Sequence, residues 1–146
     1  MQVKDMEQVI DNVRMQGLEN HVAELEIQGF TTIKRVLSAE TVSKAKQAII
    51  SRVEKQTAKE VDLQTGAGFE GLTYIPYLLY DDEVFESILM ETRPLALVTY
   101  LLGESALLSS MGCHFKGPGG DPLVLHSDNG NGMPAPFPAY SQVANV

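Results

Sequence analysis

The feature that most constrains the fold is a change of character near residue 103. Residues 1–103 carry apolar side chains mostly at helical spacing, whereas residues 104–146 are rich in glycine and proline between short apolar runs. Apolar side chains every three or four residues favour helices, and glycine and proline interrupt regular structure. The sequence therefore predicts a single domain over 1–146, in which helices come first and strands and loops follow.

The expected helices of the first part have recognisable ends. Serine and aspartate favour helix starts, proline fits a first turn, and glycine often follows a helix end. His21 falls in a polar helical stretch and is expected at the surface. The predicted elements are a helix over about 4–26 (broken at Gly17, ended by Gly29), a strand over 30–36, a helix from Ser38 to about Lys59, a helix capped by Asp81 or Asp82, and a helix with Pro94 in its first turn that ends at Gly103.

The second part is expected to supply strands. We predict strands over 106–116 and 123–128 and another that begins near Tyr140, separated by loops rich in glycine and proline. Alternate residues of a strand point to opposite faces. In the first strand, one predicted face is apolar and packs under the helices (Met111, Cys113 and Phe115), and the other is polar (Ser110, Gly112, His114 and Lys116).

His126-Ser127-Asp128 is the pattern that points most directly to chemistry. Residues two apart in a strand share a face, so this imidazole and this carboxylate could hold one metal ion. They are two of the three ligands of the 2-His-1-carboxylate site of non-heme Fe(II) oxygenases. The third ligand would be a later histidine, and residues 129–146 contain none. The alternative interpretation is a surface or structural histidine beside an aspartate in a turn.

Composition excludes several other classes of function. The net charge is −8 and no basic stripe exists, so nucleic acid is not an expected partner. No apolar run approaches the roughly 18 residues of a membrane helix, and the acidic, amphipathic start does not read as a signal peptide. The single Cys113 cannot form an internal disulfide, which fits a cytoplasmic location.

A resemblance to a known family adds to these observations. Over about residues 20–146, the chain resembles the phytanoyl-CoA dioxygenase family in three motifs. These are Pro118-Gly119 followed by Leu125-His126-Ser127-Asp128, the segment Gly29-Phe30 before a predicted strand, and Phe85 followed by Leu101-Leu102-Gly103. The resemblance implies an α+β fold with N-terminal helices packed on a double-stranded β-helix, or jelly roll, which would be incomplete in this chain. It implies Fe(II) held by His126, Asp128 and a later histidine, and 2-oxoglutarate whose distal carboxylate pairs with a later arginine.

The resemblance also suggests contacts to 2-oxoglutarate from the strand over 106–116. The polar face of this strand would line the barrel interior, where an anion needs hydrogen-bond donors. Lys116 and His114 are the candidates. The alternatives are a solvated strand end for Lys116 and an ordinary hydrogen-bonded barrel residue for His114. A register shift by one residue would put Met111 in their place.

The expected function is the N-terminal part of an Fe(II)/2-oxoglutarate-dependent dioxygenase. The whole enzyme would hydroxylate a small organic substrate with O2 and release succinate and CO2. This chain alone is expected to be inactive, because the distal histidine and the arginine are missing. One alternative is a non-catalytic jelly-roll module with a binding or structural role. A second alternative is an interaction module whose open strand edges pair with another chain. A third is a metal-dependent hydrolase, which would need more histidine and aspartate than this chain contains.

Overall fold

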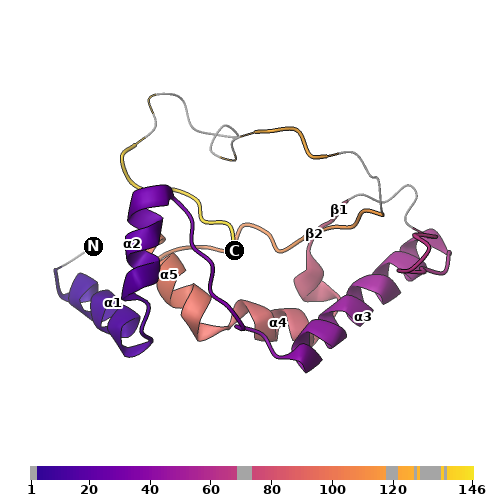
Figure 1. Cartoon of the computed structure of the whole chain (residues 1–146), viewed down its shortest axis with the longest axis horizontal. Helices are drawn as coiled ribbons and strands as arrows, with labels where there is room; N and C mark the ends of the chain where they lie inside the picture. The colour runs from indigo at the N-terminus through magenta and orange to yellow at the C-terminus, as the bar shows by residue number, and fades with distance from the viewer. Residues whose placement is uncertain (1–2, 69–73, 118–121, 127, 129–135, 137) are drawn as a thin grey trace. The chain divides into compact units, whose positions relative to one another are not determined.

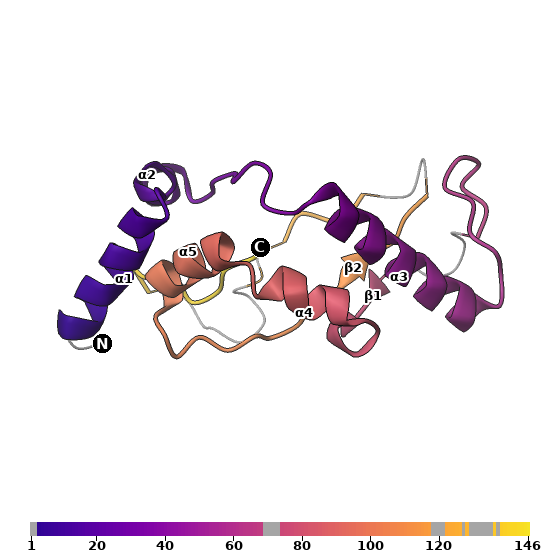
Figure 2. The ribbon, with the colours of Figure 1, turned by 90° about the horizontal axis from the view of Figure 1, so that it is seen from below.

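The computed structural model describes residues 3–68, 74–117, 122–126, 128, 136 and 138–146. The chain forms two compact units (Figures 1 and 2). The first unit contains the described residues within 1–36, 91–107 and 124–146, and the second contains those within 37–90 and 108–123. Each unit has its own cluster of buried apolar side chains.

Three helices form the first unit: α1 (Val3–Met15), α2 (Glu19–Gln28) and α5 (Thr92–Leu102). The predicted break at Gly17 is confirmed, because the backbone there is left-handed, with a φ of 65°. Gly29 ends α2 as expected, and its N–H donates to the Leu25 carbonyl. The helices enclose a small core of Val13, Leu18, Ala96 and Leu97.

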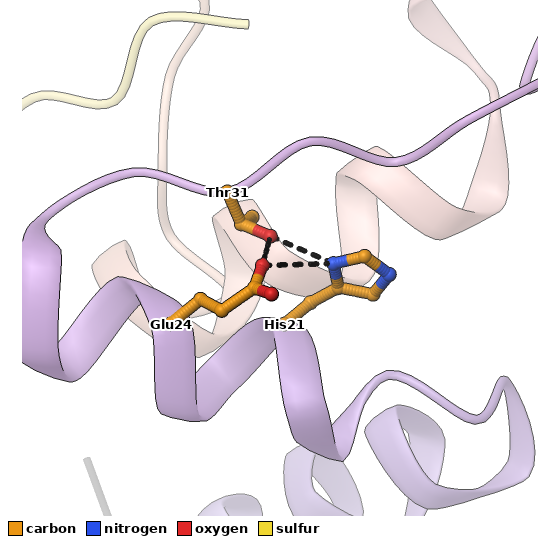
Figure 3. A network of polar contacts seen from close by, with 3 residues as sticks. All are labelled: His21, Glu24 and Thr31. Carbon is orange, nitrogen blue, oxygen red and sulfur yellow. Dashed lines mark hydrogen bonds and ion pairs between the residues drawn. The ribbon is translucent and has the colours of Figure 1, made fainter.

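The predicted strand over 30–36 is wrong, because the structure has no regular element there. Instead, a side chain holds the start of this segment to α2 (Figure 3). The Thr31 hydroxyl donates to Glu24 Oε2, and its oxygen lies 2.7 Å from His21 Nδ1. A β-branched sequence forms a strand only where a neighbouring strand accepts its backbone hydrogen bonds. His21, which we expected at the surface, is partly exposed and takes part in this network.

The second unit is built on α3 (Ala39–Thr57) and α4 (Glu83–Leu89), which contact each other (Figure 2). Ser38 caps α3 as predicted, since its side chain accepts a hydrogen bond from the Thr41 N–H. Of the two aspartates proposed for α4, Asp82 is the cap. A short 3-10 helix, η1 (Leu78–Tyr80), precedes α4. The buried core of this unit contains Val53, Ile75, Leu78, Val84, Phe85 and Phe115.

One two-stranded antiparallel sheet is present among the described residues, with β1 (Tyr74–Ile75) paired to β2 (Cys113–His114). Tyr74 lies opposite His114, and Ile75 lies opposite Cys113. The long predicted strand over 106–116 is therefore regular only at Cys113 and His114, near its C-terminal end, but its predicted apolar face is correct. Phe115 is buried, and Met111 and Cys113 pack against the same core.

The expected jelly roll is wrong. The described residues contain five α-helices and one two-stranded sheet, and neither 123–126 nor 138–146 is a strand. A jelly roll requires two packed sheets of about four strands each, in which every strand finds neighbours. Here Met111, Cys113 and Phe115 are covered by helices, while Leu123, Val124 and Leu125 remain exposed. No described helix has the length and apolar character needed to cross a membrane.

Candidate metal-binding site

His126 and Asp128 face each other in the first unit. His126 Nε2 lies 3.1 Å from Asp128 Oδ1, and the two side chains are 51% and 45% exposed. In metal sites, histidine nitrogen and carboxylate oxygen bind at about 2.0–2.2 Å, so two donors at right angles lie about 3.0 Å apart. The separation of these two atoms therefore suits neighbouring ligands of one metal ion.

The other ring nitrogen of His126 has a partner of its own. Nδ1 lies 2.8 Å from the carbonyl oxygen of Val124, and a carbonyl can only accept, so this nitrogen carries a proton. The Val124 carbonyl, and then the nearby Asp128 carboxylate, raise the pKa of His126 above its usual value. The raised pKa favours a proton on Nε2 as well, which donates to Asp128 Oδ1, and only loss of that proton leaves a lone pair on Nε2 for a metal ion.

Asp128 also has a second partner, which no sequence motif indicated. Asn145 Nδ2 donates to Asp128 Oδ2 over 2.6 Å. The two oxygens of the carboxylate therefore serve different neighbours, Oδ1 facing His126 and Oδ2 facing Asn145. Asn145 lies 17 residues further along the chain, and no spacing rule relates an isolated asparagine to a distant aspartate.

The described part of the chain supplies two donors and not a complete metal site. No group of three or more histidine, cysteine, aspartate or glutamate residues that could hold a metal ion is found among the described residues. A facial triad needs three protein ligands. Ser127, which separates the two donors in sequence, lies outside the described residues.

The residues predicted to contact 2-oxoglutarate belong to the second unit. His114 is in β2, and its ring lies over Tyr74 of β1 with the ring centroids 5.0 Å apart. Lys116 follows this strand and is exposed, as is His114. The predicted cosubstrate residues and the predicted metal ligands thus belong to different units.

A groove of about 1170 Å³ in the second unit lies between α3 and α4. Arg52 of α3 and Asp81, just before α4, form an ion pair there, with 3.3 Å between Nη1 and Oδ1. Arg52 Nε and Asp81 Oδ2 are buried and have no hydrogen-bond partner. None of the predicted site residues lines this groove, so it gives no support to the iron site.

Comparisons with family models, with curated proteins and with solved structures find no match to this chain. The resemblance to the phytanoyl-CoA dioxygenase family consequently stays a prediction from motifs.

Proposed function

We propose that His126 and Asp128 are two ligands of a ferrous ion in an Fe(II)/2-oxoglutarate-dependent dioxygenase. The enzyme hydroxylates a small organic substrate with O2 and releases succinate and CO2. The observation that supports this proposal is the 3.1 Å approach of His126 Nε2 to Asp128 Oδ1. An imidazole and a carboxylate are the ligand types that the 2-His-1-carboxylate site uses.

Each predicted site residue of the chain has a defined role in this proposal. His126 donates its Nε2 lone pair, and the carboxylate of Asp128 offsets part of the metal charge. His114 and Lys116 are proposed to donate hydrogen bonds to the carboxylates of 2-oxoglutarate, which suits their chemistry. Bound iron and 2-oxoglutarate supply the oxidising chemistry, and the protein contributes binding and orientation.

The proposal requires a third protein ligand, which the described residues do not provide. We therefore expect this chain alone to bind Fe(II) weakly and to have little or no hydroxylase activity. A non-catalytic binding or structural module is the second candidate. The observations that favour it are the two-donor site and the mainly helical fold, which is not that of the proposed family.

The proposal also covers the cellular location of the protein and its association with other chains. We place it in the cytoplasm, because a reducing compartment suits a chain whose single cysteine, Cys113, is a free thiol. A further proposed property is association through strand edges, since β1 and β2 pair only with each other among the described residues.

Anaerobic calorimetric titration with Fe(II) tests the metal site. His126→Ala and Asp128→Ala are each expected to abolish the binding seen with the unmodified chain. His114→Ala is the matched control, because it removes another exposed imidazole from a different unit, and its Fe(II) affinity should be unchanged. Equal affinity in the unmodified chain and in His126→Ala would refute the assignment.

Succinate production separates the two candidate functions. The unmodified chain, for which little or no activity is expected by itself, is incubated with Fe(II), 2-oxoglutarate and O2, without and with a peptide or chain that supplies the third ligand, and succinate is measured by chromatography. Fe(II)-dependent succinate that disappears in His126→Ala supports the dioxygenase. Iron binding at His126 without any succinate, even when a peptide or chain that supplies the third ligand is added, supports the non-catalytic module.

A further inference from the structure

We propose that His21, Glu24 and Thr31 form a pH-sensitive clasp, which holds the segment after α2 more firmly when His21 is protonated. His21 and Glu24 lie three residues apart on α2, and Thr31 approaches both from the segment that follows (Figure 3). The Thr31 hydroxyl donates to Glu24 Oε2 and lies 2.7 Å from His21 Nδ1, which is 3.5 Å from Glu24 Oε2. This clasp is independent of the proposed iron site.

The clasp is complete only when His21 Nδ1 carries a proton. A threonine hydroxyl has one hydrogen to donate, and an ionised carboxylate can only accept. With a proton on Nδ1, the ring donates to Thr31 while Thr31 donates to Glu24, so both contacts form. With a bare Nδ1, the single hydroxyl hydrogen can go to His21 or to Glu24 but not to both, and one contact is lost.

Protonation of His21 guarantees the complete arrangement. The imidazolium ion carries a proton on each ring nitrogen, whereas the neutral ring carries one proton and can place it on either nitrogen. Nε2 points away from the clasp (Figure 3), and no hydrogen-bond partner for it is found among the described residues, so no contact there fixes the tautomer. Histidine is the side chain that ordinarily changes charge between pH 5 and pH 8, so we expect the clasp to loosen as the pH rises through this range.

The neighbouring helices leave this response to the clasp itself. In the described part of the chain, Glu24 is the only group that forms an ion pair with His21. Tyr100 of α5 also contacts α2, but its hydroxyl donates to Glu26 Oε1 over 3.0 Å. Burial, and then Glu26, raise the pKa of Tyr100, so this phenol stays neutral throughout the range in which His21 responds.

The clasp acts on the first residues beyond α2. Gly29 ends α2, and Ile33 packs against the core of the first unit. Thr31 forms its hydrogen bonds to α2 between these two points. The clasp therefore decides whether residues 30–32 are held against α2 along their length or only at their two ends.

Urea denaturation of the full chain at pH 5.5 and at pH 8, toward the two ends of the usual histidine range, tests the clasp. Thr31→Val keeps the shape of the side chain and removes the hydroxyl. Because the complete clasp has one more hydrogen bond, this change should raise the unfolding equilibrium constant about 2–10-fold more at pH 5.5 than at pH 8. In a His21→Gln background, whose side-chain amide does not titrate, the effect of Thr31→Val should be the same at both pH values.

Thr32→Val is the matched control. Thr32 is an exposed threonine of the same segment, and no side-chain hydrogen bond of Thr32 is found among the described residues. Its replacement should have the same effect on stability at both pH values. A pH dependence in Thr32→Val as large as that in Thr31→Val would overturn the clasp.

NMR spectroscopy of the unmodified chain does not depend on any variant folding. The couplings of the Thr31 methyl group should report one side-chain rotamer at pH 5.5 and several at pH 8, and the ¹⁵N signals of His21 should show both neutral tautomers at the higher pH. Thr31 rotamers that do not change with pH overturn the proposal. It is also overturned if Thr31→Val has equal effects at both pH values, or if the pH dependence persists in His21→Gln.

Discussion

Gly68 shows how one residue can be required by the backbone around it. Its φ is 84°, and a Cβ built on it would lie 3.0 Å from the Cα of Val61 and 3.1 Å from the carbonyl carbon of Glu60. Neither neighbour is a flexible side chain that could rotate away. A side chain at this position would therefore be unfavourable both for its backbone conformation and for its contacts.

We predict that Gly68→Ala lowers the free energy of unfolding by about 2–5 kcal/mol, from the left-handed backbone and from the clash together. Gly17→Ala is the control, because Gly17 has a similar φ of 65° but open space around its Cβ position. The control should lose only about 1–2 kcal/mol. Urea denaturation measures both, and equal losses would show that the contacts of Gly68 do not matter.

Cys113 provides a prediction about pH. Burial raises the pKa of its thiol, since the thiolate is poorly solvated there. Above the pKa of the unfolded thiol, the folded chain holds more protons than the unfolded chain, so stability falls as the pH rises through this range and is unaffected by the thiol below it. Cys113→Ala should remove this part of the pH dependence in urea denaturation between about pH 7 and pH 10. Parallel pH profiles for the two proteins would contradict the prediction.

Secondary-structure elements of this chain were predictable where their signals are local. Ser38 and Asp82 cap helices, and Gly29 and Gly103 follow helix ends, as their side-chain chemistry and backbone freedom led us to expect. The strand over 30–36 was not predictable in this way. Its sequence suits a strand, but Thr31 forms hydrogen bonds to α2, and no strand in the described part of the chain pairs with this segment.

The cap of α3 can be tested directly. Ser38→Ala removes the acceptor of the Thr41 N–H, and we expect a loss of about 1 kcal/mol in the free energy of unfolding. Ser43→Ala, at an exposed position inside the same helix, should change stability by less than about 0.5 kcal/mol. Thermal denaturation followed by circular dichroism measures both variants. A similar change in the two would show that the hydrogen bond of Ser38 adds nothing.

At the scale of the whole molecule, the helices carry the fold. Two separate apolar clusters form, one around Leu18 and Leu97 and the other around Val53 and Phe85. The jelly-roll prediction is wrong here, because it required the segments beyond 104 to pair as strands, and among the described residues of that part only Cys113 and His114 are in a strand. Met111, Cys113 and Phe115 pack on a core formed mainly by α3, α4 and η1, as their predicted apolar face required.

Far-UV circular dichroism tests this correction. We expect a spectrum dominated by helix, since the helices include α3 with 19 residues and α1 with 13. The only sheet among the described residues has two residues in each strand. A jelly roll would give a spectrum dominated by strand instead. Such a spectrum from the purified chain would show that the helical structure is not the one in solution.

The sequence by itself determined the helix ends, the break at Gly17 and the inward face of residues 111–115. These features depend on neighbours a few residues away, through capping, backbone conformation and the alternation of side chains. It also singled out His126 and Asp128 as possible ligands, but Asn145 and the Val124 carbonyl emerged only from the structure.

Only the tertiary structure decided which segments pair as strands. A strand depends on hydrogen bonds to a segment that can lie anywhere in the chain, and sequence spacing does not identify that segment. Here β2 found a partner in β1, some forty residues earlier, while residues 123–126 found none among the described residues. The same physical reason separates a helical fold from the jelly roll that the motifs suggested.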